Sequence, residues 1–112
     1  MMRLGLLVLA LGSILSAPAS AQSALAAQGE KVFAAKKCSV CHLVGGVGNK
    51  KSQTLDGVGS KLAAEEIRQW ITNAPEMAAK AKADRKPAMK AYSNLTREDL
   101  DALVAYLQTL KK

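Results

Sequence analysis

The chain has 112 residues and a formal net charge of +7, with 16 lysines and arginines against 9 acidic residues. This length favours a single domain. A basic balance suits a nucleic acid, an anionic membrane or an acidic protein as partner, and the absence of any recognisable nucleic-acid module argues against the first.

The first 21 residues have the pattern of a cleaved export signal. Arg3 gives a positive start, residues 4–15 carry almost no polar atoms, and residues 19–21 match the small-x-small pattern of a signal-peptidase site. The apolar run is shorter than the roughly 20 residues that cross a bilayer. We therefore expect residues 1–21 to be removed, leaving one periplasmic domain over residues 22–112 without stable membrane insertion. A retained membrane anchor is the alternative.

The first half of this domain predicts two helices joined by a long loop. Residues 23–37 are rich in alanine and other good helix formers. Residues 44–60 contain five glycines and predict a loop. Residues 63–73 predict the second helix, which we expect Ser60 to cap and Pro75 to end.

The second half predicts a short helix, a loop and a longer amphipathic helix. Residues 76–83 favour the short helix, and Pro87 breaks any continuation. We expect Thr96 to cap the last helix, with acidic residues in its first turn and Lys111 and Lys112 at its end. One apolar stripe of that helix comprises Leu100, Leu103, Val104, Leu107 and Leu110. No stretch alternates strongly enough to predict a sheet, so the expected fold class is all-α.

Cys38, Cys41 and His42 form the sequence Cys-x-x-Cys-His, which is typical of covalent c-type haem attachment. Two thiols three residues apart on a helical turn can reach two vinyl groups on one edge of a porphyrin. The imidazole that follows then projects over the ring and can bind iron. We therefore predict Cys38 and Cys41 as attachment points and His42 as an iron ligand.

Three other interpretations of this motif remain open. A thioredoxin-like dithiol expects a preceding strand and a βαβ context, neither of which the sequence shows. A structural zinc site needs four ligands, whereas His42 is the only histidine and no second cysteine pair exists. A plain disulfide between Cys38 and Cys41 is the third alternative.

The chain resembles class I cytochromes c over nearly all of residues 22–112. A helix that runs into the cysteine motif, a glycine loop with residues 55–59, Trp70 in a middle helix, residues 87–89 (Pro-Ala-Met) and a terminal amphipathic helix carry the resemblance. It implies the cytochrome c fold, in which short helices and loops surround one covalent haem c. It also implies His and Met as axial ligands and outer-sphere electron transfer as the function.

The second axial ligand must then be Met77 or Met89. Met77 lies in an alanine-rich helical stretch and is better explained as a packing or surface residue. Met89 lies in a proline-bounded loop, and the family places its ligand in a Pro-x-Met context, so we predict Met89; a gap-filling core methionine is the alternative. Such ligation raises the reduction potential and excludes dioxygen and peroxide. In the family, a proline carbonyl in the loop after the motif often accepts the ring N–H of the histidine. No proline occurs between His42 and Leu62 here, so we expect an acceptor within residues 53–55.

The resemblance implies supporting roles for further residues. Gly29, Phe33 and Tyr106 resemble the family's close crossing of terminal helices. Trp70 is expected either to place its indole N–H near a haem propionate or to be a core residue with a backbone partner, and Tyr92 could act similarly. The side chains expected to touch the ring are Leu43, Val58, Leu62, Leu95 and Leu103.

Basic residues gather near both predicted ligands. They are Lys80, Lys82, Arg85, Lys86 and Lys90 near Met89, and Lys36, Lys37, Lys50 and Lys51 near the cysteine motif. We expect a positive ring that steers docking onto acidic redox partners, with an ordinary solvated face as the alternative. The expected function is that of an exported, monomeric electron carrier and not an enzyme, because no second redox centre or acid–base constellation is present. A haem-bearing subunit of a larger periplasmic oxidoreductase is the main alternative, and a haem sensor with an open axial site is another.

Overall fold

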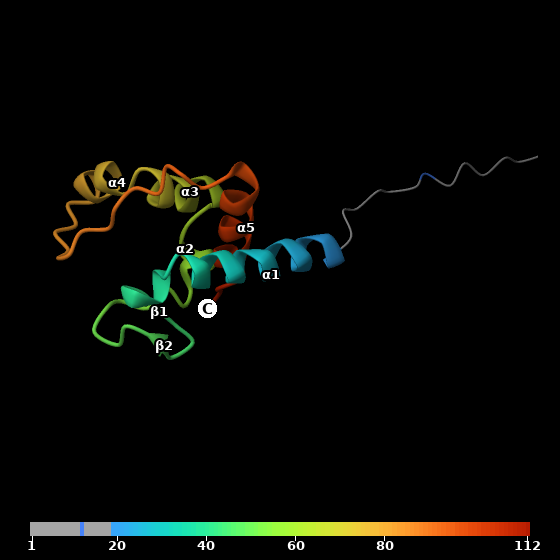
Figure 1. Cartoon of the computed structure of the whole chain (residues 1–112), viewed down its shortest axis with the longest axis horizontal. Helices are drawn as coiled ribbons and strands as arrows, with labels where there is room; N and C mark the ends of the chain where they lie inside the picture. Colours follow the sequence, from blue (N-terminus) through green and yellow to red (C-terminus); the bar gives the residue numbers. More distant parts are fainter. Residues whose placement is uncertain (1–11, 13–18) are drawn as a thin grey trace, which may run out of the picture.

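The computed structural model describes Gly12 and residues 19–112 (Figure 1). Most of the expected signal segment, residues 1–21, lies outside this described part, and its cleavage stays a prediction. The elements are α1 (Ala19–Ala35), the 3₁₀ turn η1 (Cys38–Val40), β1 (Leu43–Val44), β2 (Val47–Gly48), α2 (Val58–Lys61), α3 (Ala64–Thr72), α4 (Ala74–Lys80) and α5 (Arg97–Gln108). The all-α fold class is confirmed, since helices dominate and each strand has two residues.

The first and last helices, α1 and α5, cross closely (Figure 1). A Cβ atom placed on Gly29 would collide with the backbone carbonyl of Ala102, so only glycine permits this approach. Beside the crossing, the rings of Phe33 and Tyr106 meet edge to face, with centroids 5.5 Å apart and planes inclined at 61°. The expected crossing of the terminal helices is therefore confirmed.

The hydrophobic core lies between α1, α3 and α5. Its buried members are Val32, Phe33, Ile67, Ile71, Leu103, Val104 and Leu107. Leu100 and Leu110 are partly buried against this cluster, so the apolar stripe predicted for the last helix does face the core. The core thus joins three helices that lie far apart in the sequence.

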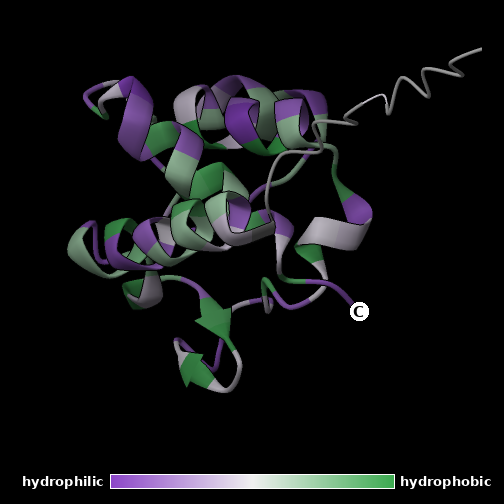
Figure 2. Ribbon diagram, turned by 90° about the vertical axis from the view of Figure 1, so that its right-hand side faces the viewer, coloured by the Kyte–Doolittle hydropathy of each residue, from purple (hydrophilic) through white to green (hydrophobic). Residues whose placement is uncertain are grey.

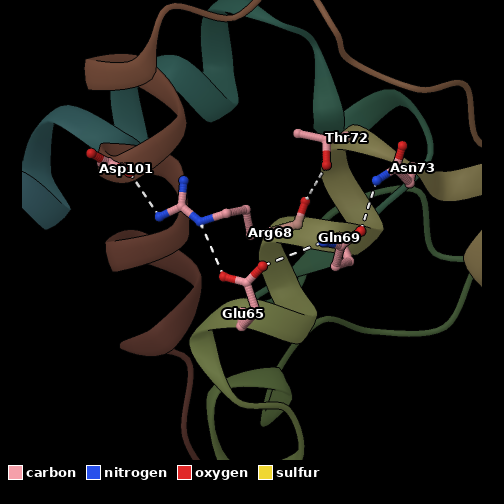
Figure 3. Close-up of polar contacts among 6 residues, drawn as sticks. All are labelled: Glu65, Arg68, Gln69, Thr72, Asn73 and Asp101. Atoms are coloured by element: carbon pink, nitrogen blue, oxygen red, sulfur yellow. Dashed lines mark hydrogen bonds and ion pairs between the residues drawn. The ribbon is translucent and has the colours of Figure 1, made fainter.

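An ion pair also joins α3 to α5 (Figure 3). Arg68 Nη2 lies 2.7 Å from Asp101 Oδ1, and Arg68 Nε lies 3.7 Å from Glu65 Oε2. The hydroxyl of Thr72 donates to the carbonyl of Arg68 at 3.0 Å. The Arg68–Asp101 ion pair holds the middle helix, which carries Trp70, against the last helix, whereas the other two contacts lie within α3.

The predicted capping residue was right for α5 and wrong for α3, although the predicted start of α3 agrees with the structure. Thr96 caps α5, because its hydroxyl oxygen accepts the Asp99 N–H at 3.1 Å. The N-cap of α3 is Ala63, which makes no side-chain capping bond. Ser60 instead lies in α2, where its hydroxyl oxygen accepts the N–H of Lys112 at 3.1 Å.

Other boundaries were also displaced. Pro75 does not simply end a helix; it lies in the first turn of α4, where its missing N–H leaves no hydrogen bond unmade. Helix α5 ends at Gln108, so Lys111 and Lys112 lie beyond it.

The predicted loop over residues 44–60 contains most of the helix α2 and part of a small antiparallel hairpin, and the expectation of no sheet was wrong to that extent. In the hairpin, Leu43 pairs with Gly48 and Val44 pairs with Val47. Figure 2 shows both strands as hydrophobic segments at the edge of the molecule.

Candidate functional site

The cysteine motif forms a tight turn directly after α1. Lys37 adopts a left-handed conformation (φ 56°) that ends the helix, and residues Cys38–Val40 form η1. The N–H groups of Cys41 and His42 both donate to the carbonyl of Cys38, at 3.1 and 2.9 Å. The turn expected for this motif is therefore present. Both cysteines are free thiols, Cys38 half-buried and Cys41 exposed, so the structure contains no disulfide between them.

Burial shifts the pKa values of the His42 imidazole and the Cys38 thiol. Loss of solvent around His42 lowers the pKa of its imidazole below the usual value. Burial is likewise the largest influence on Cys38 and raises the pKa of its thiol, against a smaller opposing effect of a backbone hydrogen bond. The imidazole is therefore neutral at pH 7, which is the form that binds a metal.

Two adjoining cavities bring the predicted site residues together. The first, of about 410 Å³, is lined by Cys38, His42 and Met89 and reaches into the core. The second, of about 870 Å³, is lined by the same three residues and by Cys41. Met77 lines neither cavity. The four residues predicted from the sequence thus share one concave region, although Met89 lies far along the chain from the motif.

The inner cavity is mainly apolar. Of the side chains expected to touch a ring, Val58 and Leu62 line both cavities, and Leu95 and Leu103 line the first. Leu43 lines neither; its carbonyl oxygen instead accepts hydrogen bonds from Thr54 and Leu55, so its expected role is not supported.

A few polar groups also line both cavities. Trp70, Tyr92, Gln53 and Arg85 occur in both linings. Among the described residues, Trp70 is half-buried with no recorded hydrogen bond from its indole, and Arg85 has no ion pair, so the choice between the two expected roles of Trp70 stays a prediction. Burial raises the pKa of Tyr92, which keeps its hydroxyl protonated at neutral pH.

Residues 53–55 lie beside the histidine, as expected for the acceptor of its ring N–H. The Leu55 N–H donates to the Leu43 carbonyl at 2.8 Å, and Leu43 and Thr54 form an isolated parallel bridge. Gln53 lines both cavities together with His42. Among residues 19–112 no hydrogen bond to the imidazole itself is recorded, so the identity of the acceptor stays a prediction.

Met89 lies on an exposed segment, residues 84–95, which we call the methionine loop. Met89 itself is half-buried, whereas the residues from Ala81 to Ala88 are exposed. Within the described chain, one backbone hydrogen bond joins this loop to another element, from the Tyr92 N–H to the Ile71 carbonyl at 2.9 Å. The ammonium of Lys90 lies 5.1 Å from the centroid of the Tyr92 ring.

The donor set fits a covalently attached haem better than the alternatives. An apolar cavity with two free thiols, one imidazole and one thioether at its walls suits a macrocycle with thioether links and His/Met ligation. The described residues contain no group of three or more His, Cys, Asp or Glu side chains suited to a metal ion, so a zinc site is not supported. The motif follows a helix and not a strand, which disfavours a thioredoxin-like dithiol.

The comparisons with known proteins agree with this interpretation. A family model described as cytochrome c matches residues 26–111. The "Cytochrome c oxidase subunit 2" of Alkalihalophilus pseudofirmus is 32% identical over 95 residues, which cover 78% of this chain and 26% of that protein. The chain thus spans about a quarter of this relative's length. No solved structure matched. Among the described helices, none has the length and apolar character that crossing a membrane requires.

Proposed function

Because the chain belongs to the cytochrome c family, we propose that it is an exported single-haem electron carrier that shuttles electrons between redox proteins. Its cofactor is covalently bound haem c, and the family's role is electron transfer. The similarity to an oxidase subunit 2 covers a small part of that protein and does not favour a subunit role here.

Four side chains are proposed to hold the cofactor. Cys38 and Cys41 form the thioether links, and His42 and Met89 are the axial ligands. The observation that carries this proposal is that all four residues line the same cavity. When bound, the haem iron supplies a one-electron couple; the neutral thioether of Met89 favours its reduced form, and two protein ligands leave no position for dioxygen.

The cavities offer apolar walls for the haem ring and a few polar groups for its propionates. Apolar side chains such as Val58, Leu62 and Leu103 exclude water, which supports a high reduction potential. The polar groups of Trp70 and Arg85 are proposed to face the propionates, because a partly buried carboxylate needs hydrogen-bond donors or a positive charge.

Docking is proposed to use the basic rim of the second cavity. The cationic residues in its lining are Lys37, Lys51, Lys61, Arg85, Lys86 and Lys90. Exposed cations around a redox site attract acidic partners over a distance of about 10 Å at moderate salt. Electron-transfer rates with an acidic partner should therefore fall steeply with ionic strength, and rates that barely respond would contradict this part of the proposal.

The experiment that tests the carrier role is a potentiometric titration combined with carbon monoxide exposure. The protein is produced in a host able to attach haem c. We expect one reversible one-electron couple, six-coordinate low-spin spectra in both oxidation states, and no carbon monoxide adduct of the native reduced protein. Ready binding of carbon monoxide would instead favour a sensor with an open axial position.

A further inference from the structure

The segment that follows His42 is a hairpin, residues 43–48, in which Val44 packs against the core. Its turn consists of Gly45 and Gly46, and apart from their chain neighbours no atom of the described residues lies within 4 Å of a Cβ placed on either one. Val47 is 72% exposed. Val44 packs against the hydrophobic core, but packing does not hold the turn or Val47, so polar contacts must fix the position of this part of the hairpin.

A short chain of hydrogen bonds fastens the hairpin to residues 54–56. The Thr54 hydroxyl donates to the Leu43 carbonyl at 3.2 Å and accepts the Asp56 N–H at 3.0 Å. The Asp56 carboxylate accepts the Gly45 N–H at 2.9 Å. We call Thr54 and Asp56 the clamp, because together they hold the first strand and the turn of the hairpin.

The other strand of the hairpin returns to the histidine. A Cβ placed on Gly48 would collide with the carbonyl oxygen of His42 and crowd that of Ser39, so the backbones are in close contact. The Asn49 N–H donates to the His42 carbonyl at 3.3 Å. Movement of the hairpin would therefore move the backbone that carries the imidazole.

We propose that Thr54 and Asp56 are positioning residues that fix the orientation of the His42 imidazole by holding the hairpin in place; this inference rests on the proposed ligation of iron by His42. Residues outside the first ligand sphere commonly orient a metal-bound histidine. In this chain the proposed orientation acts through the backbone, by way of the Thr54 contact with the Leu43 carbonyl and the Asn49 contact with the His42 carbonyl. The low pKa of Asp56, caused first by the Gly45 N–H and next by Thr54, agrees with a carboxylate that stays ionised and bonded.

The test compares Asp56→Ala with Asp56→Asn in the haem-loaded protein. Asn keeps a carbonyl acceptor for Gly45 but removes the charge, so it separates the hydrogen bond from electrostatics. We expect Asp56→Ala to raise the exchange rate of the Gly45 amide roughly fivefold, as for the loss of one exposed hydrogen bond. The haem-methyl proton shifts of the oxidised protein, which report the rotation of the axial imidazole, should change with it. Asp56→Asn should retain wild-type shifts.

Thr54 supplies an independent pair of variants. Thr54→Val removes the hydroxyl and should alter the haem-methyl shifts, whereas Thr54→Ser keeps the hydroxyl and should preserve them. Thr72→Val is the matched control, because it removes the same group from α3 without touching the hairpin.

Two outcomes would overturn the clamp. Unchanged methyl shifts in Asp56→Ala, with faster Gly45 exchange, would mean that the contacts are only structural. Equal effects of Asp56→Ala and Asp56→Asn would attribute the change to charge. Failure of His42 ligation would appear differently, as the absence of a six-coordinate spectrum already in the wild-type protein.

Discussion

The two sides of the proposed haem site are built in different ways. On the histidine side, residues 38–57, hydrogen bonds link η1, the hairpin and residues 54–56 into one connected unit. On the methionine side, the methionine loop has one described backbone hydrogen bond, from Tyr92 to Ile71, and is largely exposed. The protein backbone therefore positions His42, one of the two proposed axial ligands, whereas Met89, the other, would depend on packing and on iron binding in the proposed holoprotein. Changes on the two sides should therefore have different consequences.

The largest effect is expected from removing a group on the histidine side. His42→Ala, or loss of either cysteine, should impair haem attachment and cooperative folding, because the cofactor completes the core between the loops. Haem absorbance and far-ultraviolet circular dichroism measure the two losses. Val40→Ala is the control, since Val40 lies within the motif but is 66% exposed. A well-folded, haem-free His42→Ala protein would contradict this expectation.

The second largest effect is expected from a substitution at the crossing of α1 and α5, which supports both sides of the site. Gly29→Ala should destabilise the holoprotein by about 2 kcal/mol, because the new methyl group would force α1 away from the Ala102 carbonyl. At an exposed helical site the same change would stabilise by up to about 1 kcal/mol, so the sign itself is diagnostic. Urea denaturation measures it, with Ala27→Ser on the exposed surface of α1 as control. Increased stability of Gly29→Ala would disprove the close crossing.

Substitution of Met89 should change the visible spectrum and the reduction potential, with a smaller effect on folding. Met89→Ala should abolish the sulfur–iron absorption of the oxidised protein and lower the potential by a measurable part of the roughly 0.8 V that axial ligands span. Potentiometry and the visible spectrum test this, and Met77→Ala should leave both unchanged. The reverse pattern would transfer the ligand to Met77.

The smallest effect concerns the pH dependence of stability on the histidine side. Hydrogen bonding from Gly45 and Thr54 lowers the folded-state pKa of Asp56 below its usual value, which in unfolded chains is about 3.9. Its stabilising contribution is therefore fully present above that value and disappears as the pH falls through the lower folded pKa. Urea midpoints measured from pH 5 downward should fall more for the wild type than for Asp56→Asn. Parallel curves would mean that Asp56 is not held in its ionised form.

Local signals predicted the parts of the fold that local chemistry determines. The cap at Thr96, the stripe along α5 and the turn at the cysteine motif depend on neighbouring residues and were confirmed. Pro75 has the chemistry of a helix start, but the sequence did not show that it serves α4. Ser60 caps no helix, because its hydroxyl oxygen accepts the N–H of Lys112, a long-range contact that no local pattern shows. The strands are too short for any alternation to be visible.

The residues of the candidate site also fall into those that a local pattern predicts and those that it does not. The motif at residues 38–42 could be recognised from spacing, whereas pairing it with Met89 needed the family resemblance, because no local pattern reports a contact across so many residues. The clamp was missed altogether. Asp56 lies within the predicted loop over residues 44–60, and nothing in the sequence indicates that its partner is the amide of Gly45.

The most direct test of the account is mass spectrometry of the peptide that contains Cys38 and Cys41, taken from protein made by a host that attaches haem c. We predict that this peptide carries the mass of one haem, that acid–acetone extraction leaves the colour with the polypeptide, and that no haem is found elsewhere. A folded polypeptide whose cysteine peptide has its unmodified mass would contradict the account.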